Sequence, residues 1–189
     1  FYNTRNLLVV EEGAKVEVIE SHHNFDETYV FTNSVTEIFA DKNAKADWHK
    51  LQNDSDTSYL VDHTFAKQER DSLATVNTFS FGGKLVRNNL DFIHNGENIN
   101  SFMNGITIIG GEQLVDHHTA VHHKTPNCES YQNYKGVYKD SSKGVFLIEN
   151  PFSFLQRLGG LSFFSSYVFF AVLMDKNKNI KVIKRKNIV

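Results

Sequence analysis

Four of the chain's nine histidines and its only cysteine fall within one short segment, Leu114–Cys128, which reads LVDHHTAVHHKTPNC. Imidazole nitrogens and thiolates are the ligands that zinc, iron and copper take in proteins, and a thiolate can also act as a nucleophile. The segment therefore indicates a metal site, a catalytic strand, or a structural array of histidines.

The spacing of these histidines limits what a single strand can do with them. Alternate residues of a β-strand share a face, so His118 and His122 would face one way and His117 and His123 the other. One face then offers two imidazoles, and a metal site needs further ligands from a neighbouring strand or a second subunit. The chain has no HExxH motif, and its histidines form adjacent pairs. We interpret them as structural, with a metal site at His118 and His122 as the alternative.

Cys128 follows a proline turn, TPNC. A lone cysteine is most often a small buried apolar residue. A reactive thiolate requires an accessible, electropositive setting, which His122, His123 and Lys124 could supply. With one cysteine, neither a two-Cys, two-His zinc finger nor a four-cysteine site can form within the chain.

Composition narrows the class of protein. The chain has 189 residues, enough for one domain with a core, and a net charge of −2 that gives no attraction to nucleic acid or anionic membrane. A single cysteine excludes an internal disulfide framework and fits a reducing compartment. The first residues lack a methionine and the layout of a signal peptide. We expect a cytoplasmic protein, which could be an internal piece of a longer one.

The first 146 residues read as consecutive strands that repeat at a spacing of about 30 residues. The segment EEGAKVEVIE (11–20) recurs as DKNAKADWHK (41–50), and GGKLVRNN (82–89) resembles GGEQLVDHH (110–118) with one insertion. Stacked solenoid coils repeat in this way, and the doublets Asn88-Asn89 and His117-His118 would then lie at equivalent places on successive coils. The repeat alone leaves a sandwich and a β-helix nearly tied.

After Phe146 the composition changes. Residues 158–174 carry no charge, and the last fifteen residues are basic. As a helix, 158–174 would be about 26 Å long, which is short for a bilayer core of about 30 Å. Its phenylalanines and its lack of alternation fit a further solenoid coil poorly. Membrane association through this apolar segment and its basic flank is an unfavoured alternative.

A series of ordered motifs resembles the SufB/SufD family of iron–sulfur cluster assembly proteins, and its SufD member more than SufB. The motifs are RNNL, NGITII, DHHT, the proline–Cys turn and YKGV, and the resemblance runs from about residue 5 to residue 146. It implies an all-β fold, a right-handed parallel β-helix. It also implies a noncatalytic scaffold subunit that pairs with a SufB-like subunit and binds a SufC-like ATPase.

The resemblance further implies that DHHTAVHH belongs to one rung of the β-helix, with a secondary role for Cys128, His117 and His123 in handling sulfur or iron. We expect no tightly bound cofactor in this chain and a transient iron–sulfur cluster in the complete complex. Under this resemblance, we expect no counterpart in these 189 residues of the family's initial helices, its later coils with a Cys-x-His-Gly stretch, or its ATPase-docking helices.

We therefore divide the chain into a partial β-helix scaffold domain (1–146) and an atypical apolar, Phe-rich tail (147–189) that a truncation or frame change could have produced. Open coil ends predict self-association. The alternative function is a mononuclear metalloenzyme that uses His118 and His122 with a ligand from another strand.

Overall fold

The computed structural model describes residues 1–24, 28–149, 168–174 and 180–186, the last two stretches as backbone only. All regular elements in these ranges are β-strands. The odd-numbered strands up to β11 form one sheet: β1 (Tyr2–Val10), β3 (Val30–Ala40), β5 (Ser58–Gln68), β7 (Leu85–His94), β9 (Leu114–His123) and β11 (Lys143–Glu149). The other sheet contains β2 (Lys15–His22), β4 (Lys45–Gln52), β6 (Leu73–Ser80), β8 (Asn100–Ile109), β10 (Glu129–Lys139), β12 (Val168–Met174) and β13 (Ile180–Lys186).

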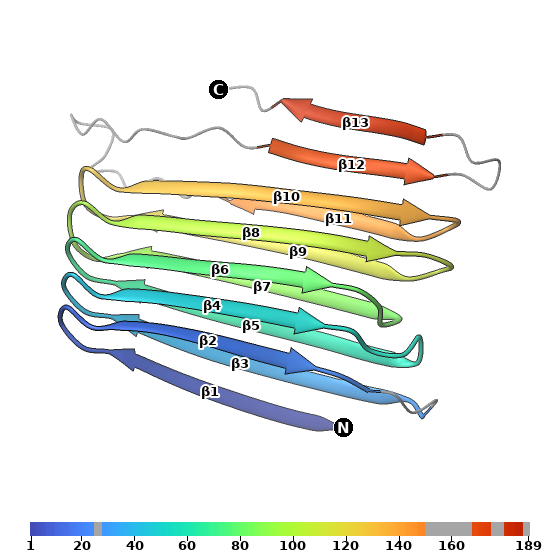
Figure 1. Ribbon diagram of the computed structural model, residues 1–189, viewed down its shortest axis with the longest axis horizontal. Helices are drawn as coiled ribbons and strands as arrows, with labels where there is room; N and C mark the ends of the chain where they lie inside the picture. Colours follow the sequence, from blue (N-terminus) through green and yellow to red (C-terminus); the bar gives the residue numbers. More distant parts are fainter. Residues whose placement is uncertain (25–27, 150–167, 175–179, 187–189) are drawn as a thin grey trace.

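From β1 to β12, consecutive strands alternate between the two sheets, so this part of the chain winds as a parallel β-helix of about 5 turns (Figure 1). Each strand of the winding pairs in parallel with the strand two positions later, as β7 does with β9. This pairing aligns residues about 30 positions apart in the sequence. Lys15 lies beside Lys45, and Asn88 and Asn89 lie beside His117 and His118, which confirms both repeats found in the sequence.

The strands of the central coils bury every second residue, as strict alternation along β7 and β9 shows. Buried residues point into the space between the sheets, where Ile38, Val76, Phe92, Met103 and Val121 form part of the apolar core. Polar side chains share this interior, including Asp62, Asn88 and His117. Because parallel pairing stacks equivalent positions, each interior side chain meets its counterpart on the next coil.

In each of the first five coils, the turn from the odd-numbered strand to the next even-numbered strand contains one residue with a left-handed backbone. These residues are Gly13, Asn43, Asp71, Asn98 and Asn127, with φ between 57° and 71°. Gly, Asn and Asp tolerate this conformation best, so the sequence places a suitable residue at each corner. In coils two to five the next residue is buried, and at successive corners it is Ala44, Ser72, Ile99 and Cys128.

The C-terminal strands correct one expectation. The sequence predicts that residues 158–174 fit a further coil poorly, yet within that range β12 pairs in parallel with β10, and β13 then pairs antiparallel with β12. A strand that is apolar on both faces shows no alternation of apolar and polar residues, so the lack of alternation does not exclude a strand. The Val and Phe residues of β12 favour the strand conformation. Residues 158–167 lie outside the described residues. No helix among the described residues is long and apolar enough to span a membrane.

Candidate functional site: a buried histidine and cysteine cluster

The strand β9 presents its four histidines in two pairs, as the sequence predicted. His117 and His123 point into the β-helix and are 4% and 5% exposed. His118 and His122 lie on the outer face and are half-buried. The two faces therefore present separate chemical settings.

His117 forms a polar contact between two coils and the opposite sheet. The side-chain amide Nδ2 of Asn88 on β7 donates to His117 Nδ1 at 3.3 Å, and His117 Nε2 lies 3.0 Å from Thr107 Oγ1 on β8. Because Nδ1 accepts, the ring proton is at Nε2 and donates to the threonine hydroxyl. Burial, together with the nearby His118, lowers the pKa of His117 to about 4, so the ring is neutral at pH 7. Both ring nitrogens are used in holding coils together.

The outer pair is not brought together with a third ligand. His118 Nε2 lies 2.9 Å from Asp116 Oδ1 on its own strand, and Nδ1 lies 3.4 Å from Arg87 Nη2. His118 and His122 are four residues apart on one strand, which separates them by about 13 Å. Neither belongs to a group of three potential metal ligands among the residues that the structure describes. The metal role of this pair stays a prediction that the observed geometry does not favour.

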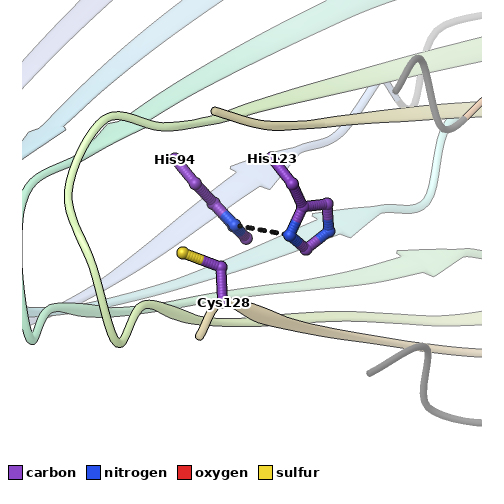
Figure 2. A group of neighbouring side chains, drawn as sticks. All are labelled: His94, His123 and Cys128. Atoms are coloured by element: carbon purple, nitrogen blue, oxygen red, sulfur yellow. Dashed lines mark hydrogen bonds between the residues drawn. The ribbon is translucent and has the colours of Figure 1, made fainter. Parts of the chain in front are cut away.

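The interior histidine His123 gives a different result, because it meets two further potential metal ligands inside the β-helix. One ring nitrogen of His123, one of His94 and the Sγ of Cys128 lie within 4.8 Å of one another (Figure 2). His94 ends β7 directly beside His123 at the end of β9, and Cys128 occupies the corner that leads into β10. All three side chains are buried. This His94–His123–Cys128 cluster is the one such group among the described residues.

A directed series of hydrogen bonds fixes the protons of the two histidines. Ser101 Oγ donates to Gln68 Oε1 at 2.6 Å, so its oxygen must accept from His94 Nε2, also at 2.6 Å. The proton of His94 is therefore at Nε2, and its Nδ1 accepts from His123 Nδ1 at 3.3 Å. His123 Nε2 then accepts from the Ser130 hydroxyl at 3.2 Å. The direction of the series depends on the Gln68 amide, whose Nε2 donates to the backbone carbonyl of Asn100 at 3.1 Å.

The electrostatics of the cluster agree with this assignment. Burial, with a smaller effect of the neighbouring His123, lowers the pKa of His94 to about 3. Burial also lowers the pKa of His123. Both imidazoles are thus neutral at pH 7, which is the state in which imidazole binds metals.

Cys128 lies at the corner position that Ala44, Ser72 and Ile99 occupy in earlier coils, and it is 1% exposed. Its thiol donates to the carbonyl oxygen of Gly96 at 3.3 Å. The expectation of a small buried residue is met by this placement.

A second polar group lies in the interior of the early coils, around Lys50. Its Nζ is 2.5 Å from Asp62 Oδ2, 2.6 Å from Thr64 Oγ1 and 3.7 Å from Glu20 Oε2. Burial acts to raise the pKa of Glu20, but hydrogen bonds from His22 and Trp48 and the charge of Lys50 outweigh it and lower the pKa to about 2. This group is an internal ion pair network, and sequence reasoning did not identify it.

His94 was also missed, although the sequence contained a signal for it. The repeat of GGKLVRNN and GGEQLVDHH, continued to the end of both strands, aligns His94 with His123. Ser101 and Ser130 align in the same way on β8 and β10. Extending the repeat by five residues beyond Asn89 and His118 would have aligned His94 with His123.

Comparisons with known proteins identify a family whose match covers the residues of the β-helix. The family described as "SUF system FeS cluster assembly, SufBD core domain" matches residues 1–147. Similar proteins include "Protein ABCI7, chloroplastic" of Arabidopsis thaliana, which is 31% identical over 141 residues, covering 74% of this chain and 30% of the relative. The iron–sulfur cluster assembly protein SufD of Escherichia coli is 28% identical over 142 residues, covering 75% of this chain and 34% of its own length.

An iron–sulfur cluster assembly SufBD family protein of Synechocystis is 27% identical over 150 residues, covering 75% of this chain and 33% of that protein. The chain therefore spans about a third of the length of the curated relatives it matches.

Proposed function

Because this chain belongs to the SufBD core-domain family of the SUF system for iron–sulfur cluster assembly, we propose that it is a SufD-like, noncatalytic scaffold subunit. The observation that carries the proposal is the family match over residues 1–147, which coincides with the β-helix up to β11. The Escherichia coli relative is named for the same process. Interaction within Suf complexes is the general role of such relatives.

The proposal includes two specific partners, a SufB-like subunit and a SufC-like ATPase. What supports a protein partner is the shape of the molecule, since a β-helix exposes a strand edge at each end of the winding. At the N-terminal end, β1 pairs on one side only, with β3, and its side chains are mostly exposed. We place the protein in a reducing compartment such as the cytoplasm, because its single cysteine fits that setting. One relative is named as chloroplastic.

Within the proposed scaffold, Cys128 and His123 are the interior residues best placed to handle sulfur or iron, because they meet in one buried cluster. His117 has a different position, since both of its ring nitrogens bind neighbouring side chains.

Co-expression tests the proposal directly. The tagged 189-residue chain should co-purify with the SufB-like subunit and the ATPase encoded in the same genome. A surface variant that adds charge to the β1 edge, Leu7→Lys, should weaken the interaction if the partner covers that edge. Ile108→Lys serves as the matched control, because Ile108 is an exposed apolar residue of β8, a strand that pairs on both sides. Failure of the chain to bind either partner, alone or in the context of its longer parent protein, would overturn the proposed complex.

A further inference from the structure

We propose that His94, His123 and Cys128 bind one divalent transition-metal ion of borderline softness through the two Nδ1 atoms and the thiolate. The inference rests on the proposed function only for the identity of the natural ion, for which we expect Fe²⁺. It departs from the expectation that this chain holds no tightly bound cofactor.

The distance between the two imidazoles fits a shared ion. In a tetrahedral site with metal–nitrogen bonds of about 2.0–2.1 Å, two nitrogen ligands lie about 3.3–3.4 Å apart. His94 Nδ1 and His123 Nδ1 are 3.3 Å apart. An ion can therefore replace the hydrogen bond between these atoms with small movements of the rings. Cys128 Sγ lies within 4.8 Å of a nitrogen of each ring, so the thiolate can move to its bonding distance of about 2.3 Å through its own rotation and small shifts of the coil.

The surroundings of the cluster supply the outer contacts that metal-bound histidines need. A histidine that binds a metal through one nitrogen almost always uses the other to bond an oxygen, which fixes the ring. His94 Nε2 bonds Ser101 and His123 Nε2 bonds Ser130, each on the side of the ring away from the Nδ1 pair. The two serines occupy equivalent positions on adjacent strands, so both rings are held in the same manner.

The protons balance in a simple way. His94 already has its proton at Nε2 and offers Nδ1 as a free lone pair once the hydrogen bond to His123 is replaced. His123 moves its proton from Nδ1 to Nε2, where it donates to the Ser130 oxygen after that hydroxyl turns. Cys128 loses its thiol proton, so binding releases one proton per ion and changes no oxidation state. Three protein ligands leave the fourth position open, as in sites that hold an exchangeable ligand.

The first experiment titrates the metal-free 189-residue chain with Co²⁺ under anaerobic conditions. Cys128 is the only cysteine, so a thiolate-to-cobalt charge-transfer absorption can come only from this residue. We expect the absorption to saturate at one ion per chain, with the intense visible bands of tetrahedral cobalt, and to be displaced by Zn²⁺. Calorimetry with Zn²⁺ in two buffers should show release of one proton per ion. A chain without the thiolate absorption, or with no stoichiometric binding, overturns the proposal even if no variant can be studied.

Two variants copy residues that the same fold already uses at the equivalent positions. Cys128→Ala places at this corner the residue found at Ala44, and His123→Gln places there the residue found at Gln68 in the same interior column. Cys128→Ala should abolish the thiolate absorption and weaken Zn²⁺ binding at least tenfold, and His123→Gln should weaken it similarly. The control is the outer-face double variant His118→Ala/His122→Ala, which should retain full binding. Loss of binding in the control alone would overturn the proposal in favour of the metalloenzyme alternative.

The outcome is separable from that of the proposed function. Metal binding without partner binding would leave the ion site standing and remove the scaffold. Partner binding by a chain that takes up no ion would overturn this inference and leave the scaffold standing.

Discussion

Lys50 Nζ and Asp62 Oδ2 are 2.5 Å apart inside the β-helix, and their side chains are 4% and 2% exposed. The pair joins β4 of one sheet to β5 of the other, and Glu20 on the preceding coil lies 3.7 Å from the same ammonium group. Charges at this depth are tolerated because they neutralise one another and share hydrogen bonds with Thr64 and Trp48. The interior of the early coils therefore depends on one lysine.

Replacement of Lys50 should be severe. In Lys50→Met the carboxylates of Asp62 and Glu20 remain buried without their cation, and we expect the free energy of unfolding to fall by about 3–5 kcal/mol. Urea denaturation measures this. The matched control is Lys45→Met on the same strand, which should change stability by less than about 1 kcal/mol. The Lys45 side chain is 41% exposed, and its Nζ lies 3.8 Å from Asp47 Oδ2. Equal effects of the two substitutions would contradict the account of the interior pair.

The buried histidines should make stability depend on pH below neutrality. The pKa values of His94 and His117 are about 3 and about 4 in the folded protein, against 6.5 for an ordinary histidine. At pH values between the folded pKa and the unfolded pKa of these histidines, the unfolded chain binds more protons than the folded protein does. Their contribution to stability is therefore complete above about pH 6.5 and is lost as the pH falls. Each histidine should cost about 2 kcal/mol at pH 5 relative to pH 8.

Urea midpoints between pH 8 and pH 5 test this dependence. His117→Asn, which copies Asn88 of the preceding coil, should lower the slope of the free energy of unfolding against pH by the equivalent of about one proton. Thr119→Val on the same strand removes no titrating group and should leave the slope unchanged while altering stability itself. The pKa of Glu20, which is about 2 against 4.5 for an ordinary glutamate, should add a separate loss below about pH 4.5. A stability that is flat from pH 8 to pH 5 would contradict the burial of neutral histidines.

Gly105 should tolerate no side chain. A Cβ there would lie 2.2 Å from Cδ1 of Tyr134, the buried ring that packs against His117 and Phe146. We expect Gly105→Ala to displace this ring and lower the free energy of unfolding by about 1–3 kcal/mol. Gly110→Ala is the control, because its Cβ would meet side-chain atoms only at 3.7 Å. Thermal melting of both variants decides the point, and a stable Gly105→Ala would show that Tyr134 packs differently.

The C-terminal strands should limit self-association. β12 pairs with the edge of β10, so a chain that ends at Glu149 would expose that edge. We expect residues 1–149 to form larger species than residues 1–189 in sedimentation velocity at equal concentration. The opposite order would mean that residues 150–189 promote association.

The sequence predicted the winding of the chain better than its interior chemistry. The Lys15/Lys45 match and the alignment of Asn88-Asn89 with His117-His118 are both present, because in-register parallel pairing preserves any repeat. His94 could not be assigned from its own segment, since LDFIH contains no ligand spacing. It becomes part of a cluster only through stacking with His123 and the turn to Cys128. Lys50 and Asp62 likewise meet across two sheets, which no local pattern encodes.

The central claim is that the protein contributes to iron–sulfur cluster assembly, and cluster content in cells tests it most directly. The gene would be deleted in the source organism, and the activity and iron–sulfur content of an enzyme that carries a [4Fe–4S] cluster would be measured under iron limitation. An enzyme without a cluster serves as the control. We predict that the cluster-containing enzyme loses activity, that the control does not, and that the restored gene recovers the loss. Unchanged cluster content in the deletion strain, with no second SufD-like gene present, would contradict the proposed function.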